Sequence, residues 1–131
     1  MTRMHAFAAG AVALLLTGTS AWAGLKQTWL VGVDAQQSEA WGSIGAARAS
    51  PDTVQMMGCS LYSFAYGSES ASCMAITSAG MKVTCTSTTP AIVNAVRSVT
   101  DSSYIFFRWD SAGKCTYLAV SNTSNMTTRQ P

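Results

Sequence analysis

The sequence predicts an α+β domain, in which a single antiparallel sheet of about five strands carries one helix on a face and is held by two disulfides. Three observations support this fold class. Apolar and polar residues alternate between turn-forming residues, one segment has a helical apolar stripe, and four cysteines lie in the body of the chain. A length of 131 residues suits one domain, and a content of 48% hydrophobic and 11% charged residues excludes a disordered tail.

Residues 1–23 have the pattern of a signal peptide rather than of a structural element. Arg3 provides the positive end, residues 6–16 form an apolar run, and Ala21-Trp22-Ala23 matches the small-x-small cleavage pattern. The run is shorter than the roughly 20 apolar residues that a spanning helix needs. We therefore expect cleavage after Ala23, a secreted or periplasmic protein, and no membrane span after cleavage.

Residues 24–53 are the N-terminal strand and loop segment of the expected domain. The apolar run 29–33 is typical of a short strand, and the polar stretch 36–40 is typical of a turn. Residues 41–49 are rich in Gly, Ala and Ser, so extended and loop structure both stay open. A chain break follows at Ser50-Pro51-Asp52, because proline restricts its own backbone and that of its predecessor.

A disulfide-stabilised core is expected over residues 54–121, and it begins with three strands. Residues 54–64 alternate as a strand does. Residues 72–77 and 81–86 form a hairpin around Ser78-Ala79-Gly80, since glycine accepts the left-handed conformation that three-residue hairpin loops need.

A helix and a second hairpin complete this core. The helix begins at a threonine N-cap beside Pro90. Its apolar stripe consists of Ile92, Ala95, Val96 and Val99. The hairpin joins residues 104–109 to residues 115–121, and bulky residues on both faces place the first strand centrally in the sheet. The aromatic residues expected in the core are Tyr104, Phe106, Phe107 and Trp109. Residues 122–131 are a polar C-terminal tail that we expect to fray.

The four cysteines predict two disulfides, because their number is even and the chain is expected to be exported. They are Cys59, Cys73, Cys85 and Cys115. Zinc is disfavoured because the cysteines lack close paired spacing. Three connectivities are open. Of these we expect Cys59–Cys73, between the first strand and its neighbour, and Cys85–Cys115, between the two hairpins.

Several kinds of chemistry are disfavoured by composition. The only histidine, His5, lies in the expected signal peptide, so the cleaved chain has no Ser–His or Cys–His pair. A formal charge of +2 without a basic cluster argues against a nucleic-acid partner. Six isolated carboxylates leave a carboxylate-dependent hydrolase open. Asp52, Asp101 and Asp110 are better explained as turn or cap residues.

Tyr62 and Tyr66 are the best candidates for a binding surface, because they lie close to a Ser- and Gly-containing loop that we expect to be exposed. The sequence assigns no catalytic residue, no cofactor and no metal site. We therefore expect a secreted, disulfide-stabilised binding or interaction protein without catalytic activity, whose ligand is a protein or a glycan. The alternatives are a carboxylate-dependent extracellular hydrolase and a secreted or periplasmic inhibitor of another enzyme.

Two stretches of the chain are distinctive. The first reads GSIGAARASPDTVQ over residues 42–55 and leads to Gly58-Cys59. The second runs from Val96 through Ser103-Tyr104-Ile105 to residues 110–116. These stretches resemble a family of small secreted four-cysteine bacterial proteins of unassigned function, and the resemblance covers most of residues 42–121. It implies export and the four-cysteine framework, and it transfers no catalytic residue.

Overall fold

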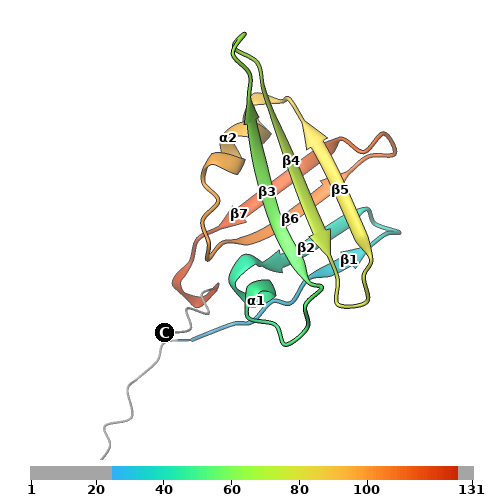
Figure 1. Ribbon diagram of the computed structural model, residues 1–131, viewed down its shortest axis with the longest axis vertical. Coiled ribbons are helices and arrows are strands. Elements are labelled where there is room, and N and C mark those ends of the chain that lie inside the picture. Colours follow the sequence, from blue (N-terminus) through green and yellow to red (C-terminus); the bar gives the residue numbers. More distant parts are fainter. Residues whose placement is uncertain (1–24, 127–131) are drawn as a thin grey trace, which may run out of the picture.

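The computed structural model describes residues 25–126, which form two antiparallel sheets (Figure 1). One sheet has four strands in the order β1-β2-β6-β7, and the other has three in the order β3-β4-β5. The elements in chain order are β1 (Gly32–Asp34), β2 (Glu39–Ser43), α1 (Ile44–Arg48), β3 (Met56–Ser63), β4 (Glu69–Ile76), β5 (Lys82–Ser87), α2 (Pro90–Arg97), β6 (Tyr104–Trp109), β7 (Cys115–Ser121) and the 3-10 helix η1 (Ser124–Met126). The expected signal peptide, residues 1–23, lies outside the described residues, as do residues 127–131.

The prediction of a single five-stranded sheet with a helix on its face is wrong. Strand β6 is central, as expected, but its neighbours are β2 and β7, so it does not pair with β3, β4 or β5. The two sheets meet where β5 approaches β7, through an isolated parallel bridge between Thr86 and Lys114. Beyond that point their strands diverge and cross (Figure 1).

Two layers form because each sheet has one apolar face to bury. Strand β4 alternates, and its buried residues are Ala71, Cys73 and Ala75. The opposing sheet contributes Ile105 and Phe107, which are fully buried. Helix α2 has only eight residues, too few to cover such a face alone. Packing one sheet on the other therefore removes more apolar surface from water than a helix on a single sheet would.

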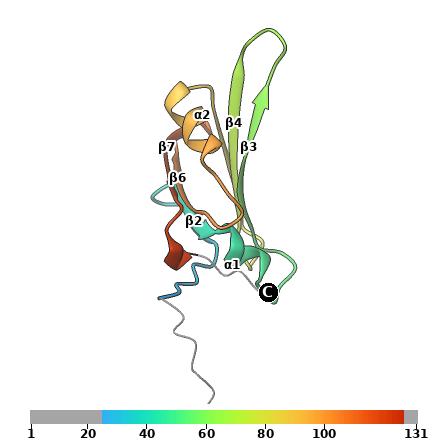
Figure 2. The ribbon, with the colours of Figure 1, turned by 90° about the vertical axis from the view of Figure 1, so that its left-hand side faces the viewer.

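The two helices close the ends of the space between the sheets. Helix α2 contacts β7 on one side and β3 and β4 on the other, and α1 contacts β2 and β3 (Figure 2). Thr89 is the N-cap of α2 and Pro90 follows it, as predicted, although the Thr89 side chain makes no capping hydrogen bond. Val93 and Val96 are the buried residues of this helix.

Both expected disulfides are present. Cys59–Cys73 joins directly opposed residues of β3 and β4, whereas Cys85–Cys115 joins one sheet to the other. Cys73 is also directly opposed to Cys85, so three cysteines form a row across the three-stranded sheet. Two formed disulfides are compatible with an extracellular or otherwise oxidising compartment.

A hydrogen-bonded loop before β3 holds the N-terminal segment in place. The Asp52 carboxylate accepts hydrogen bonds from the backbone N–H groups of Val54 and Gln55 and from the Gln55 side chain, which confirms its predicted role as a turn residue. These bonds, that of the Gln55 side chain foremost, lower the pKa of Asp52 to about 2. The Gln55 Oε1 atom in turn accepts the N–H of Val31 at 3.0 Å.

The two ends of the described chain are bonded to each other. The Gln27 N–H donates to the Asn125 carbonyl at 2.7 Å, and the Asn125 side chain donates to Gln27 Oε1 at 3.0 Å. Asn122 donates to the Ser98 carbonyl at 2.9 Å, so the expected fraying does not apply to residues 122–126. Both ends lie on the side of the molecule opposite the turn between β3 and β4 (Figure 1).

A candidate binding surface on the β3–β4 hairpin

The β3–β4 hairpin extends beyond the rest of the molecule (Figure 1). Its turn is closed by two hydrogen bonds of 2.9 Å, from the Phe64 N–H to the Ser68 carbonyl and from the Gly67 N–H to the Phe64 carbonyl. Gly67 has a φ of 88°, a left-handed conformation that glycine adopts without strain. The loops ending at Gly80 and Gly113 are closed in the same way, and the one at Gly80 was predicted from its sequence.

Three aromatic side chains are exposed at this end, and we call Tyr62, Phe64 and Tyr66 the aromatic tip. Tyr62 is 52% exposed, Phe64 45% and Tyr66 81%. The rings of Phe64 and Tyr66 are stacked, with centroids 5.4 Å apart and planes inclined by 18°. Large apolar side chains with this exposure are costly in water unless a partner covers them, so the tip is a candidate binding surface.

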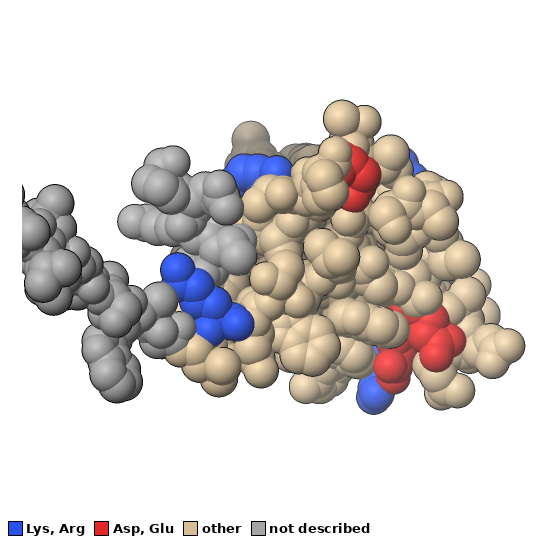
Figure 3. Space-filling view, turned by 90° about the horizontal axis from the view of Figure 1, so that it is seen from below, with Lys and Arg blue, Asp and Glu red and all other residues tan. Residues whose placement is uncertain are grey.

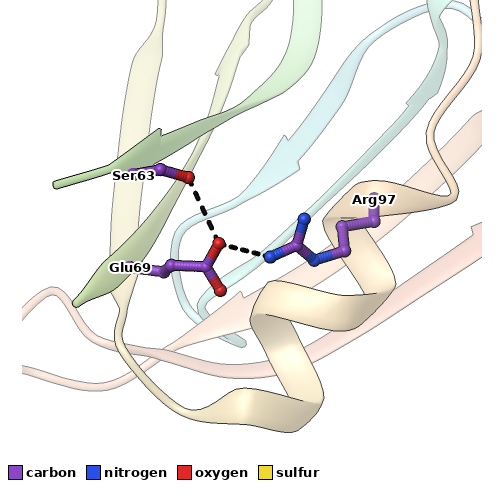
Figure 4. Close-up of polar contacts among 3 residues, drawn as sticks. All are labelled: Ser63, Glu69 and Arg97. Carbon is purple, nitrogen blue, oxygen red and sulfur yellow. Dashed lines mark hydrogen bonds and ion pairs between the residues drawn. The ribbon is translucent and has the colours of Figure 1, made fainter. Parts of the chain in front are cut away.

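A polar contact joins the hairpin to helix α2 just below the tip. The Glu69 Oε1 atom accepts a hydrogen bond from Ser63 Oγ at 3.2 Å and is paired with the Arg97 guanidinium (Figure 4). The hydrogen bond from Arg97 is the main cause of a lowered pKa for Glu69. All three side chains are solvent-accessible, so the contact adds little stability, but it ties the orientation of the hairpin to the helix.

A shallow hollow lies between the turn and the start of α2. It measures about 210 Å³. Its lining residues are Gly67, Glu69, Thr88, Pro90, Val93 and Asn94. Sites for drug-sized molecules usually measure about 300–1,000 Å³. The hollow is therefore better suited to a single protruding group of a larger ligand than to a complete small molecule.

The sequence identified two of the three members of the aromatic tip. Tyr62 and Tyr66 are exposed, as expected, and their role in binding stays a prediction. Phe64 was overlooked, although it lies two residues after Tyr62 and the alternation of a strand puts both on one face. The long-range pairing of Glu69 with Arg97 had no signal in the sequence.

The expectation that four aromatic residues of β6 lie in the core is only partly right. Phe107 is fully buried, and Trp109 packs partly against the core. Tyr104 and Phe106 alternate with the buried residues and therefore lie on the outward face of the four-stranded sheet. Burial of its ring nevertheless raises the pKa of Tyr104.

The outward face of the four-stranded sheet is a second aromatic surface, but its members are engaged with one another. The Arg108 guanidinium lies 5.3 Å from the ring centroid of Phe106 and 5.8 Å from that of Tyr117. Arg108 Nε also donates to Glu39 at 2.7 Å. These cross-strand contacts satisfy the charges within the sheet, so this face is a weaker candidate than the tip.

Five of the six carboxylates among the described residues, all except Asp101, are engaged in structural contacts. Asp34 is directly opposite Glu39 across β1 and β2, yet Asp34 accepts two backbone hydrogen bonds in its own turn and Glu39 is paired with Arg108. Asp110 accepts backbone hydrogen bonds in the β6–β7 turn, as predicted. Within residues 25–126, no three His, Cys, Asp or Glu side chains are grouped so that they could hold a metal ion.

Charged side chains do not form a basic cluster on the face seen from below (Figure 3). On this face, Lys and Arg side chains stand apart from one another, and one of them lies beside acidic side chains (Figure 3). Among residues 25–126, none of the helices has the length and apolarity needed to cross a membrane.

Comparison with protein-family models, with curated proteins and with solved structures finds no match to this chain.

Proposed function

We propose that the protein is a secreted, non-catalytic binding module that inserts its aromatic tip into a concave surface of a protein partner. The observation that supports this proposal best is the exposure of Tyr62, Phe64 and Tyr66 together at the end of a projecting hairpin. Tyrosine is among the residues that contribute most to protein interfaces, because it buries a large area at a low cost in side-chain entropy.

The hairpin is also held in one conformation before it meets a partner. The Cys59–Cys73 disulfide links its two strands, the glycine turn closes its end, and the Glu69–Arg97 contact joins it to helix α2. A preorganised surface loses less entropy on binding than a mobile loop does. A convex tip requires a cleft in the partner, which is the arrangement by which an inhibitor protein blocks an enzyme.

Photocrosslinking tests whether the tip contacts a protein. A photoreactive phenylalanine analogue at position 66 is compared with the same analogue at position 117, because Tyr117 is 49% exposed on the other sheet. Both proteins are irradiated in the extracellular fraction of the organism that produces them. We expect a discrete crosslinked partner from position 66 alone, and equal crosslinking from both positions would contradict the proposal.

Affinity measurements with the purified partner then test the aromatic side chains themselves. We expect Tyr66→Ala to weaken binding at least about tenfold and Tyr117→Ala to leave it unchanged. An unchanged affinity for Tyr66→Ala would refute the assignment of the tip. A glycan, rather than a protein, bound with the same dependence on Tyr66 would also refute it. Turnover of a glycoside that is lost in a Glu69→Gln or Glu39→Gln variant would instead support the hydrolase alternative.

A further inference from the structure

Strand β3 is an edge strand, and half of its backbone groups lack a partner within the described chain. In an antiparallel ladder, directly opposed residues alternate between pairs that are hydrogen-bonded to each other and pairs that are not. The pair Phe64–Ser68 at the turn is hydrogen-bonded. Counting back along β3 from Phe64, the first, third, fifth and seventh residues therefore make no backbone hydrogen bond to β4. These residues are Met57, Cys59, Leu61 and Ser63. The short Cα–Cα distance of 4.0 Å between Cys59 and Cys73 fits such a pair. Their N–H and C=O groups therefore point away from the sheet.

The other sheet edges of the described chain are short, charged or contacted by a helix. Strand β3 is also contacted by α1 and α2, but it is longer than β1 and, unlike β5, has no charged residue. Strand β1 has three residues, β5 carries Lys82 and is bridged to Lys114, and β7 is contacted by α2. Strand β3 has eight residues without a charge, a proline or a bulge. Figure 2, which views the molecule from this side, shows no helix or strand in front of β3 toward the hairpin tip. Proteins normally protect edges of this kind, because such edges pair with other strands.

We propose that β3 pairs with β3 of a second copy of this chain, antiparallel across a two-fold axis, to form a continuous six-stranded sheet. Identical edges are self-complementary in this arrangement, since each supplies the donors and acceptors that the other lacks. Because β3 carries no charged residue, the symmetric pairing brings no like charges together. An unrelated strand would need to match this neutral edge, whereas a second copy matches it by symmetry.

The register of the pairing follows from which backbone groups are free. Hydrogen bonds form only in registers that place residues with free backbone groups opposite one another. Centring the axis on Ser60 overlaps the strands from Met56 to Phe64 and places Gly58 opposite the partner's Tyr62. A register centred one residue earlier would pair Ser63 with the partner's Gln55, whose backbone N–H is already donated to the Asp52 carboxylate at 2.7 Å. The axis at Ser60 is therefore the register that uses the whole free edge.

This dimer does not rest on the proposed function, although its register includes Tyr62 and Phe64 of the aromatic tip. The pairing uses backbone groups, so the side chains of Tyr62 and Phe64 stay on the outward face of the extended sheet. An antiparallel arrangement directs the two hairpin tips to opposite ends of the dimer. A failure of the dimer would leave the crosslinking result unaffected, and the reverse also holds.

A charge placed on the axis tests the proposal. Ser60 is exposed on the outward face of β3, and its neighbour in the central strand β4 is Ser72. Ser60→Lys puts two lysines directly opposite each other in the dimer, whereas the control Ser72→Lys puts the same charge one strand away from the interface. The mass of the disulfide-bonded protein is measured by size-exclusion chromatography with light scattering, and circular dichroism checks that each variant is folded.

We expect wild-type protein and Ser72→Lys to have twice the mass of one chain, and Ser60→Lys and Ser60→Glu each to have the mass of one chain. Mixing the Ser60→Lys protein with the Ser60→Glu protein should restore the dimer, because opposite charges then meet on the axis. Monomeric wild-type protein across the concentration range would overturn the proposal. A folded Ser60→Lys variant that is still dimeric would overturn it too, and a mixture that stays monomeric would overturn the register.

Discussion

The Cys85–Cys115 disulfide is predicted to stabilise the protein more than the Cys59–Cys73 disulfide does. Its cysteines are 30 residues apart, and the loop-closure relation gives about 3.6 kcal/mol at 25 °C for a closure of that length. The same relation gives about 3.0 kcal/mol for the 14-residue separation of the other pair. The structure widens the difference, because a tight turn already holds the β3 and β4 cysteines near each other in partly unfolded chains.

Equilibrium urea unfolding, followed by tryptophan fluorescence, measures this difference. The wild-type protein is compared with two variants, in which both cysteines of one disulfide are replaced by alanine. We expect the Cys85/Cys115 variant to lose about 3–4 kcal/mol of unfolding free energy, and the Cys59/Cys73 variant to lose less. An equal or larger loss for the Cys59/Cys73 variant would refute the reasoning that the bond between the sheets contributes most.

Three further changes test local contacts. Gly32→Ala should lower the unfolding free energy by about 1–3 kcal/mol, because a β-carbon there would lie 2.5 Å from Cζ2 of Trp41. Thermal unfolding measures this loss, which should largely vanish when the same substitution is made in a Trp41→Ala variant. Asp52→Asn should reduce the loss of stability in acid. Hydrogen bonds, that from the Gln55 side chain foremost, lower the pKa of Asp52 from 3.8 to about 2 in the folded protein. The ionised carboxylate therefore contributes its full share of the unfolding free energy above pH 3.8, and this share is lost as the pH falls through 2. Urea unfolding at several pH values from about 2 to 5 measures this loss, and an equal dependence of the unfolding free energy on pH in wild-type protein and Asp52→Asn would contradict the prediction. Ser103→Ala should cost about 1–3 kcal/mol in urea unfolding, because this fully buried hydroxyl accepts a backbone N–H and donates to an asparagine side chain, and an unchanged midpoint would contradict that role.

The parts of the fold that were predicted correctly depend on local signals. The hairpins follow from alternation and from a glycine at the end of each three-residue loop, as at Gly80. The helix follows from Pro90 and its apolar stripe. The disulfide partners follow from the order of the strands, because Cys59 and Cys73 belong to neighbouring strands of one hairpin.

Strand β2 and helix α1 were not predicted, because their composition reflects tertiary packing. Apart from Trp41, strand β2 lacks the branched and aromatic residues typical of strands. Ala40 is fully buried in the core, and a β-carbon on Gly42 would lie 3.1 Å from the Val31 backbone. Small residues are needed at these positions by neighbours distant in the sequence, and without β2 the division into two sheets was not evident.

The candidate site was predicted less completely than the hairpin that carries it. Bulky residues on both faces of β6 were interpreted as burial of both faces, but Phe106 on the outer face packs against Arg108 instead. Exposure of Tyr66 could be predicted from its turn, whereas the stacking of Phe64 on Tyr66 depends on the conformation of that turn. Contacts between side chains on different elements, such as that of Glu69 with Arg97, require the fold itself.

The bonded pair of Gln27 and Asn125 determines how the molecule can be attached to other structures. Because both ends of the described chain leave from the side opposite the aromatic tip, a fusion partner or a solid support joined at either end would hold the tip away from itself (Figure 1). Amino-terminal and carboxy-terminal tethers are therefore equivalent for displaying the hairpin, and a bulky reporter at either one leaves access to Tyr66 open.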